Sequence, residues 1–508
     1  MAIMGSSLSS AVSGLSASQR ALEVTGHNVT NAETLGYTRQ RVNQSDSHYS
    51  LFGFSGQQEL LVGTGVSIQE VAQIRDMFLD MSYRDEASTM KFYEAQMYGV
   101  SELESILGET VGGTSFSDII GNMWETLNEL SKHPEGLEAR ASFVQSAVLF
   151  VDQANQIQDQ MYDYQYMLND KVNNLVDEVN DISEQIVQLN AIIAEAEAGG
   201  VSANDYRDER NNLLDRLSEI IDIKYHEEPN GSVVVNAEGY TMIDGTSYVE
   251  MDTVVTDPNA PLSKPVWKDT NIDVFYGDID PDNNEDKGEL KGILALRGDS
   301  NVDYTYLEDS TKYEEIEDSI LMKTMAEFDY LIHHITSTIN SIVTTNTYGL
   351  DGTAGEPLFL PVKDLTGNAD DDLKAGNIMI NEDILNDVAK LGLTRDPSLP
   401  GDNTVVLEII EAWNEDSLKI NPNADYDLSI NNFYSSMVAE LGGAGTNAIT
   451  HYESQSMLVN QINNQRLSIM GVSTDQELTN MIMYQQAYNA NAKVITVIDE
   501  MIDSLMNL

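Results

Sequence analysis

The hydrophobic positions at the two ends of the chain repeat in steps of three and four residues. Near the N-terminus the stripe alternates large and small side chains, the large ones being Leu8, Leu15, Leu22 and Val29. Near the C-terminus the same spacing joins Tyr484, Tyr488, Ile495, Ile498, Ile502 and Leu505. Such spacing keeps one stripe of a helix against a partner helix. We therefore expect both ends to form helices that pair with each other or with other molecules along these positions.

The N-terminal pattern predicts a helix from about Met4 to Ala32 that ends near Gly36, a residue suited to the left-handed conformation. The alternative for this pattern is an ordinary amphipathic helix that lies on a globular core. So long a repeat is unusual for such a helix, which favours the paired arrangement. A second apolar stripe on the C-terminal segment makes that helix apolar on two faces, and it comprises Met483, Ala487, Ala490, Val494, Val497, Met501 and Leu508.

The longest hydrophobic pattern lies in the middle of the chain and predicts a helix of about 47 residues. Its stripe consists of Ala147, Phe150, Ala154, Ile157, Met161, Tyr164, Leu168, Val172, Leu175, Val179, Ile182, Ile186, Leu189 and Ile193. Two consecutive steps of four around Leu168 form a stutter, which locally unwinds a supercoil. A helix of this length needs partners along its face, and residues 207–223 are a candidate to fold back beside it.

Between these patterns the sequence predicts an alternation of helical and strand segments. Helical periodicity is expected at about 76–108, 117–132, 310–345 and 405–441, and from 448 to the end of the chain. Glycine, serine and β-branched residues predict short strands within 45–75, 224–297 and 346–405. We expect a mainly α fold with inserted β, an α+β multidomain protein in which β segments are inserted into a rod of helices.

Charge separates the ends of the chain from its middle. The whole chain has a net charge of −56, yet residues 1–44 carry +1 and residues 472–508 carry −4, which leaves −53 for the segment between them. Closely packed interfaces are depleted of charge at their centres, as both ends are. So acidic a chain repels phosphate backbones and anionic lipid, so we expect neither nucleic-acid binding nor membrane insertion.

Composition excludes several classes of site. The chain has no cysteine, so disulfides, thiolate zinc sites and thiol catalysis are excluded. Its N-terminal residues lack the basic and apolar regions of a secretory signal peptide, and no run of about 18 apolar residues predicts a membrane span. No nucleotide-binding or hydrolase motif is present. We therefore expect no cofactor and no metal.

Two terminal segments carry a resemblance to a known family. Residues 26–40, GHNVTNAETLGYTRQ, resemble the "NNIANANTPGYxRQ" signature of bacterial flagellar rod, hook and hook-associated proteins. Residues 484–501 resemble the C-terminal "YQQAYxAxAKVIxxxDEM" signature of the same family. The resemblance assigns interaction roles to residues of both signatures, namely Asn28, Asn31, Gly36, Tyr37, Arg39, Gln40, Tyr484, Gln485, Gln486 and Tyr488.

The resemblance also covers internal segments. Residues 207–218 resemble the "RDxLLDxLS" stretch of the hook-associated members, and residues 288–297 resemble their "GxLxGLLxxR". Leu35 departs from the family pattern, which has proline there, and Glu33 replaces a common asparagine. Leu35 leaves the turn before Gly36 less rigid than proline would.

The resemblance implies a structural, non-enzymatic subunit at the junction between hook and filament of the bacterial flagellum. Such a subunit is secreted through the flagellar type III apparatus and assembles through its terminal helices into a ring. The implied partners are other copies of the chain, the hook protein, a second hook-associated junction protein, and an export chaperone that binds the C-terminal helix. The resemblance divides the chain into an inner terminal-helix coiled-coil domain at 1–45 and 470–508, a helical rod at 46–223, 300–345 and 405–469, and a β-rich outer domain at 224–299 and 346–404.

An exposed apolar face on a monomer favours aggregation. We therefore expect the two ends to be disordered in solution and to fold on assembly. The alternatives are a flagellin-like or second junction protein, which the internal resemblance disfavours, and a surface-displayed hydrolase in the 224–405 insertions. A pocket with pKa-shifted carboxylates in that region would favour the hydrolase.

Three short motifs resemble binding sites without meeting their requirements. Residues 278–289 place carboxylates at the spacing of a calcium loop, but Asn283 replaces the required glycine and Pro281 stiffens the loop. We interpret this segment as a solvated acidic turn. Arg297, Gly298 and Asp299 form an adhesive tripeptide that arises easily by chance. His333 and His334 lie in an apolar helical stretch without metal-ligand spacing, which favours packed or exposed histidines.

Overall fold

The computed structural model describes residues 2–47, 49–55, 58–108, 115–200, 202–257, 260–276 and 286–506, except for the side chains of 2–4, 50–55, 58–62, 256–257 and 505. The chain divides into two compact units. Unit 1 comprises Met1–Ala87, Val179–Glu250 and Ser456–Leu508. Unit 2 comprises Ser88–Glu178 and Met251–Gln455. The three-domain division expected from the sequence stays a prediction.

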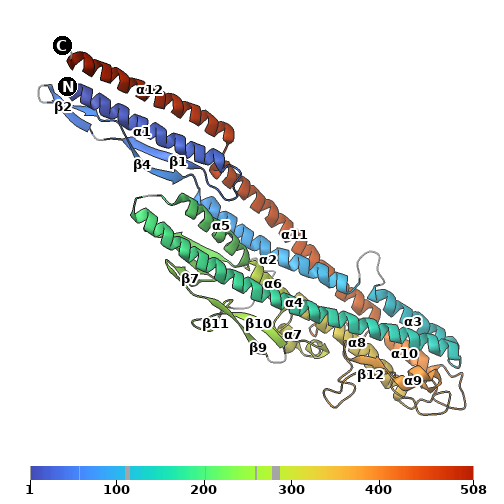
Figure 1. Ribbon diagram of the computed structural model, residues 1–508. Helices are drawn as coiled ribbons and strands as arrows, with labels where there is room; N and C mark the ends of the chain where they lie inside the picture. The colour runs from blue at the N-terminus through green and yellow to red at the C-terminus, as the bar shows by residue number, and fades with distance from the viewer. Residues whose placement is uncertain are drawn as a thin grey trace. The chain divides into compact units, whose positions relative to one another are not determined.

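The terminal helices of unit 1 lie side by side and run antiparallel (Figure 1). Helix α1 spans Ala2–Thr30 and helix α12 spans Thr474–Met506. Strands β1 (Gln40–Asp46) and β4 (Val66–Gln73) pair antiparallel, as do β2 (Tyr49–Ser55) and β3 (Gln58–Gly63). Ser9 and Ser13 of α1 contact the connection from β3 to β4, because Ser9 Oγ donates to the Thr64 carbonyl and Ser13 Oγ accepts from the Val66 N–H.

A four-stranded antiparallel sheet completes unit 1. Its strands are β5 (Ile223–Glu227), β6 (Val233–Ala237), β7 (Tyr240–Asp244) and β8 (Ser247–Tyr248), in that order. Asn190 belongs to the long helix α4 (Leu137–Ala198) and joins this sheet to it, since its Nδ2 donates to the carbonyls of Val233 and Gly245. The central strand β6 is almost wholly buried, as its run of three valines predicts.

Helix α4 is the longest element, with 62 residues from Leu137 to Ala198. Every position of the central stripe expected from the sequence is buried. The helix begins ten positions earlier than the predicted start at Ala147, and this first part buries Phe143 and Val144. Helix α5 (Asn204–Ile220) packs on the end of α4 through Leu189, Ile193 and Leu213. The predicted return of residues 207–223 beside the long helix is thus confirmed.

Unit 2 has an aromatic core. Helix α3 (Phe116–Lys132) begins with a capping box in which Ser115 and Asp118 bond each other's backbone N–H groups. Its first residue, Phe116, lies with its ring centroid 5.1 Å from that of Phe328 and 5.6 Å from that of Tyr434. Those rings belong to α8 (Ile320–Thr344) and α11 (Ile430–Met470).

The remaining elements of unit 2 are short. A three-stranded antiparallel sheet has the order β11 (Ile272–Asp273), β10 (Ala260–Trp267) and β9 (Met251–Asp257). Strands β12 (Phe359–Pro361) and β13 (Ile378–Ile380) pair antiparallel. The other helices are α2 (Met77–Ile106), shared with unit 1, then α6 (Glu289–Arg297), α7 (Ser310–Glu314), α9 (Glu382–Asn386), α10 (Thr404–Asn414) and the 3₁₀ turns Tyr304–Leu307 and Val388–Lys390.

Three local expectations from the sequence are wrong. The helix expected at 405–441 is interrupted, because α10 ends at Asn414 and α11 begins at Ile430. The predicted helix break at residues 442–447 is absent, because α11 continues through its glycines, and a Cβ on Gly445 would lie 2.8 Å from Val100. The break falls instead at Gly471. Strand texture was expected up to Arg297, but the helix α6 occupies the end of that stretch. A Cβ on Gly292 would lie 2.7 Å from the Phe92 carbonyl, so close packing against α2 fixes α6 there.

The three short motifs that resemble binding sites differ in what surrounds them. Arg297 is buried and donates to Asn169 Oδ1 and the Ser263 carbonyl, so it is not available for adhesion. His333 stacks on Tyr304, and His334 contacts Ser417. Residues 277–285, which include most of the acidic turn, lie outside the described residues.

Candidate assembly site

Small side chains form the contact between α1 and α12. The buried residues on α1 include Ala11, Ser18, Ala21 and Thr25. A Cβ built on Gly14 would lie 2.9 Å from the Asn491 side chain, so the two helices approach closely at this level. Small residues allow a close approach of backbones, so this seam depends on the small positions of the N-terminal stripe.

The large side chains expected to form the contact between α1 and α12 are mostly only half-buried. On α1, the side chains of Leu8, Leu15, Leu22 and Val29 are half-buried. On α12, Ile498 is buried, and Tyr484, Tyr488, Ile495 and Ile502 are half-buried. Gln485 and Gln486 are exposed, and the side chain of Leu505 lies outside the described residues. Whether these residues act in assembly stays a prediction.

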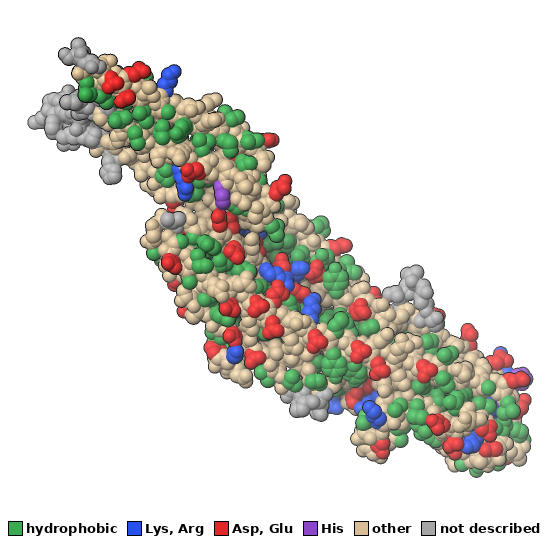
Figure 2. Space-filling view, in the orientation of Figure 1, with side chains coloured by type: hydrophobic (Ala, Val, Ile, Leu, Met, Phe, Trp, Pro, Cys, Tyr) green, Lys and Arg blue, Asp and Glu red, His purple; other side chains and the backbone are tan. Residues whose placement is uncertain are grey.

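Most of the second stripe of α12 is exposed among the described residues, although Ala487 is half-buried. Val494, Val497 and Met501 are each 46% exposed, and Met483 is 54% exposed. Figure 2 shows green hydrophobic side chains along the terminal helices. An exposed apolar stripe on a helix marks an interaction surface. One face of α12 therefore packs on α1, and another is available to a partner.

The N-terminal signature forms a polar joint at the other end of these helices. Asn28 Nδ2 donates to the Gln40 carbonyl at 2.9 Å, and Asn28 Oδ1 accepts from the Gln40 N–H at 3.0 Å. Tyr37 donates its hydroxyl to the same Oδ1 at 2.8 Å. Asn28 is 1% exposed, so all of its amide groups are satisfied inside the protein. The end of α1 is thereby joined to the start of β1.

Glu477 links this joint to α12. Its Oε2 accepts from Asn28 Nδ2 at 3.3 Å, and its Oε1 accepts from Arg39 Nε at 2.7 Å. The Arg39 N–H also donates to the Met470 carbonyl at the end of α11. Glu477 was not singled out from the sequence. The only signal for it is its place as one of six charged residues in the 37 residues from 472 to 508.

Helix α5 supplies a second carboxylate to the joint. Asp208 Oδ2 accepts from the Thr38 N–H at 3.0 Å, and Asp208 Oδ1 accepts from Gln73 Nε2 at 2.7 Å. Burial raises the pKa of Asp208 to about 6, although its hydrogen bonds with Thr38 and the nearby Arg75 oppose the rise. Burial also raises the pKa of the Tyr37 hydroxyl. Two of the segments that carry the resemblance, 26–40 and 207–218, therefore meet.

Paired charges extend the joint to α2 and α11. Asp80 binds Arg75 at 2.9 Å and Arg466 at 2.8 Å. Asp215 on α5 binds Arg466 at 2.9 Å and Arg84 at 2.6 Å. Removing one partner of such a buried pair costs about 3–5 kcal/mol, because the other charge stays buried. The arrangement makes the joint intolerant of single substitutions.

Two signature residues contribute to the turn after α1 rather than to the polar joint. Asn31 donates from its Nδ2 to the His27 carbonyl and accepts from Thr34, so it closes the end of α1 without joining the polar joint. Gly36 has a φ of 77°, and a Cβ there would lie 2.0 Å from Asn212. The residue before it, Leu35, is 94% exposed. The turn thus needs glycine at 36 and leaves position 35 free of contacts.

The described residues contain no cluster of three or more histidine, cysteine, aspartate or glutamate side chains close enough to hold a metal ion. None of their helices combines the length and apolar character that crossing a membrane requires. The chemistry of the site is therefore that of an interface: matched hydrogen bonds, paired charges and an uncovered apolar stripe.

Three family models match the chain. A model described as "Flagellar hook-associated protein FlgK helical domain" matches residues 100–359. "Flagellar basal body rod FlgEFG protein C-terminal" matches residues 463–508, and "Flagella basal body rod protein" matches residues 8–38. The two terminal matches contain the C-terminal signature, most of the N-terminal signature, and Asn28 and Glu477 of the polar joint.

Curated relatives match over nearly the whole chain. Flagellar hook-associated protein 1 of Bacillus subtilis (strain 168) is 28% identical over 514 residues, which cover 98% of this chain and 97% of that protein. Flagellar hook-associated protein 1 of Escherichia coli (strain K12) is 23% identical and covers 99% of this chain and all of its own length. Among solved structures, the flagellar hook junction protein FlgK of Burkholderia pseudomallei matches with a TM-score of 0.58 at 13% identity, covering 77% of this chain and 100% of that one. This likeness confirms the mainly α fold with inserted β.

Proposed function

The chain belongs to the flagellar hook-associated protein FlgK family, and from this membership we propose that it is a structural subunit at the junction between hook and filament of the bacterial flagellum. The relatives that it matches are named as flagellar hook-associated proteins. That the chain itself has no catalytic activity stays a prediction, which these names support.

The observation that carries the assembly mechanism is the uncovered stripe of α12. One face of this helix lies on α1, while Val494, Val497 and Met501 face away from it and are exposed. Burial of the exposed half of each such side chain in a subunit interface stabilises the assembly by about 1 kcal/mol. We propose that this stripe packs against neighbouring subunits, and that the polar joint holds the two terminal helices in register for that contact.

The partners follow from the same proposal. The chain would form a ring with its own copies, between the hook protein on one side and a second hook-associated junction protein on the other. Before export by the flagellar type III apparatus, the α12 stripe would be the surface that an export chaperone covers. The almost uncharged ends of the chain, with +1 and −4, support their role as contact surfaces.

The test places a charge in the stripe. We expect Val494→Glu and Val497→Glu to abolish filament attachment in cells that lack the natural gene product, measured by electron microscopy of hooks and by swimming. Asn489→Glu is the matched control, because it adds the same charge to an exposed polar position of α12 outside the stripe. Filament on hooks that carry Val494→Glu would refute the stripe as the assembly surface.

A separate assay addresses the chaperone. The secreted amount of each variant is measured in culture supernatant, and binding to the candidate chaperone is measured with purified proteins. If the chaperone covers the same stripe, Val497→Glu lowers both and Asn489→Glu lowers neither. Normal secretion of Val497→Glu together with failed filament attachment would separate the two roles and limit the stripe to assembly.

A further inference from the structure

An open groove lies within unit 1, between the start of α2 and the second half of α11. Leu79 of α2 lines one side, and the residues of α11 on the other side include Met457, Gln461, Asn464, Ser468 and Ile469. None of the lining residues is charged. The named residues of α11 are all exposed, with Met457 at 69%. The groove is therefore an uncharged surface that the chain itself leaves open to solvent.

This part of α11 carries two stripes of residues on opposite sides of the helix. The inner stripe is buried and consists of Val459, Ile462, Arg466 and Met470. The outer stripe lines the groove and follows steps of four, three and four residues through Met457, Gln461, Asn464 and Ser468. Such spacing keeps one stripe of a helix against a partner helix. The outer stripe thus has the periodicity of a helix contact, yet its residues are exposed.

The absence of charge from the groove bears on which molecule it contacts. Between residues 454 and 474 the only charged residue is Arg466. This side chain is 5% exposed and binds Asp80 and Asp215, so it is directed away from the groove. A net charge of −56 makes copies of the chain repel one another over most of their surface. Copies therefore approach most closely where both surfaces lack charge, and the groove meets this condition.

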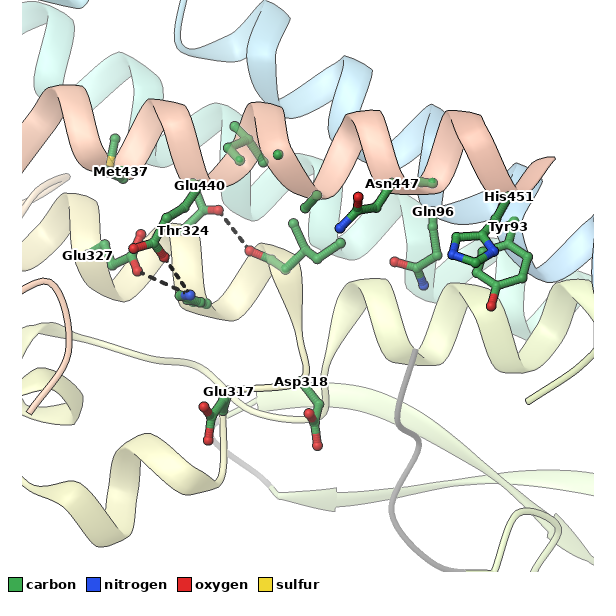
Figure 3. A pocket seen from close by; sticks show the side chains of 16 residues that line it. Tyr93, Gln96, Glu317, Asp318, Thr324, Glu327, Met437, Glu440, Asn447 and His451 are labelled. Carbon is green, nitrogen blue, oxygen red and sulfur yellow. Dashed lines mark hydrogen bonds and ion pairs between the residues drawn. The ribbon is translucent and has the colours of Figure 1, made fainter. Parts of the chain in front are cut away.

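The acidic pocket of unit 2 has the opposite character. Figure 3 shows the carboxylates Glu317, Asp318, Glu327 and Glu440 around it, and Lys323 is the single lysine or arginine in its lining. A second copy of so acidic a chain is repelled from such a surface. The contrast favours the groove of unit 1 over this pocket as a contact surface between copies.

The same pocket bears on the hydrolase alternative, because burial raises the pKa of Glu327 to about 8. A hydrolytic pair needs a second carboxylate that is free to activate water. Glu440 adds to the rise in the pKa of Glu327, but its Oε2 already accepts a hydrogen bond from Lys323 at 2.8 Å. Glu327 itself is 2% exposed, which leaves little of it open to a substrate. This pair therefore gives the hydrolase no support.

We propose that the groove between α2 and α11 receives the exposed α12 stripe of a second copy of the chain. This inference rests on the assembly role proposed above for that stripe, and it names the surface that the stripe contacts. From Met483 to Met501 the stripe also advances in alternating steps of four and three residues, and its members are uncharged. The two stripes therefore match in periodicity and in their lack of charge.

Polar groups at the contact also match. Gln486 lies at the edge of the α12 stripe, three residues after Met483, and it is exposed. Its amide both donates and accepts hydrogen bonds, as do the amides of Gln461 and Asn464 in the groove. Polar residues within a helix contact fix its register at some cost in stability. The amides of the groove thus favour a specific helix over any apolar surface.

The lengths of the two surfaces agree as well. The groove extends for about 18 Å along α11 from Met457 to Ile469, and the part of the stripe from Ala490 to Met501 extends for about 17 Å. Because the groove and the stripe are different surfaces of one chain, the contact is head-to-tail, and such contacts generate rings when the rotation closes. Each subunit contacts one neighbour through its stripe and the other through its groove.

Disulfide cross-linking between copies tests this contact, because the chain has no cysteine of its own. The chains assemble on hooks isolated from cells that lack this protein, and mild oxidation is followed by mass spectrometry of the linked peptides. A chain with Asn464→Cys is mixed in turn with chains that carry Ala487→Cys, Ala490→Cys, Val494→Cys or Val497→Cys. We expect one or two adjacent stripe positions to link to Asn464→Cys, since a disulfide requires Cα atoms within about 7 Å of each other.

Asn431→Cys is the matched control, because it replaces an exposed asparagine of α11 outside the groove, and it should link to no stripe position. Hooks that carry the chain but show no link between Asn464→Cys and the stripe would overturn the groove contact. A link of Asn464→Cys only to itself, or equal linking by Asn431→Cys, would overturn it too. Hooks that retain no unmodified chain would refute the proposed junction role, and this inference with it.

A charge in the groove provides a second readout. Purified Gln461→Glu should be retained on isolated hooks at least about tenfold less than the unmodified chain, because the contact would bury an unpaired carboxylate. Asn431→Glu adds the same charge to the same helix outside the groove and should be retained normally. Retention is measured by sedimentation of the hooks, and circular dichroism verifies that each variant is folded. Normal retention of folded Gln461→Glu would overturn the proposal, and if this variant does not fold, the cross-linking decides.

Discussion

At the scale of single residues, the polar joint depends on side chains that each satisfy several partners. Asn28 bonds both the N–H and the carbonyl of Gln40, and Glu477 holds Asn28 and Arg39 together. Such fully paired networks specify one arrangement, because any slip leaves a buried group without a partner. The register between the two terminal helices is therefore set at this joint as well as along the seam.

Asp208 gives the joint a pH dependence. Burial raises its pKa to about 6, so the folded chain binds this proton more tightly than the unfolded chain does. Its contribution to the free energy of unfolding is therefore present below about pH 4 and is lost as the pH rises to about 6. We expect Asp208→Asn to remove this fall. The measurement is urea unfolding followed by circular dichroism at a series of pH values between these limits.

The control for Asp208 is Glu209→Gln, which removes an exposed carboxylate from the next position of α5. It should keep the fall in the free energy of unfolding that the unmodified chain shows. A difference between Asp208→Asn and the unmodified chain that stays constant from about pH 4 to about 6 would contradict the raised pKa.

At the scale of elements, periodicity in the sequence predicts what a helix buries when the helix has one dominant partner face. Each expected position of the α4 stripe is buried, and α5 returns beside that helix as predicted. Periodicity does not predict the secondary structure of segments in which tertiary packing determines whether a helix forms or continues. Helix α6 and the unbroken course of α11 depend on close contacts at Gly292 and Gly445, and local propensity does not encode such contacts.

The candidate site shows the same limit. Asn28, Arg39 and Gln40 were expected from the resemblance, and all three lie in the polar joint. Their partner Glu477 was not, because it lies 449 positions from Asn28 in the chain. Pattern analysis gives the face on which a side chain lies but does not identify the distant group that it meets. Gly14 of α1 closely approaches Asn491 of α12 while Leu8, Leu15, Leu22 and Val29 are only half-buried, and sequence periodicity does not predict this because helix separation is a property of the pair.

The turn between α1 and β1 provides a prediction about how one element connects to the next. Gly36→Ala places a Cβ at a positive φ and against Asn212, so we expect a loss of about 1–3 kcal/mol in the free energy of unfolding. Gly26→Ala is the control, because a Cβ on this α1 residue meets nothing within 4 Å. It should stabilise the helix by about 0.5–1 kcal/mol. Both values come from urea unfolding.

The double variant Gly36→Ala with Asn212→Ala separates the two causes. Removing the Asn212 side chain relieves the steric contact and leaves the backbone strain, so part of the loss should be recovered. A Gly36→Ala chain as stable as the unmodified one would contradict the requirement for glycine in this turn.

At the scale of the whole molecule, the distribution of charge and of exposed apolar surface separates the contact surfaces from the solvated ones. The segment between the two ends carries −53 of the total −56, and this repulsion favours solubility and opposes association of the middle of the chain. The ends lack such repulsion and expose the α12 stripe. Association through the ends therefore requires no change in the rest of the chain.

This distribution leads to a prediction for the unassembled chain. The seam between α1 and α12 buries small side chains and leaves Val494 and Val497 exposed, so the terminal helices should open more readily than the aromatic core of unit 2. Pulsed trypsin cleavage, followed by mass spectrometry, should cut at Arg20 and Lys493 first. Lys132 is the control, since it is exposed but lies on α3, which packs in that core. Cleavage at Lys132 as fast as at Arg20 would mean that exposure alone sets the rate. In assembled junctions both terminal sites should become protected, because the neighbouring subunits then cover the stripe.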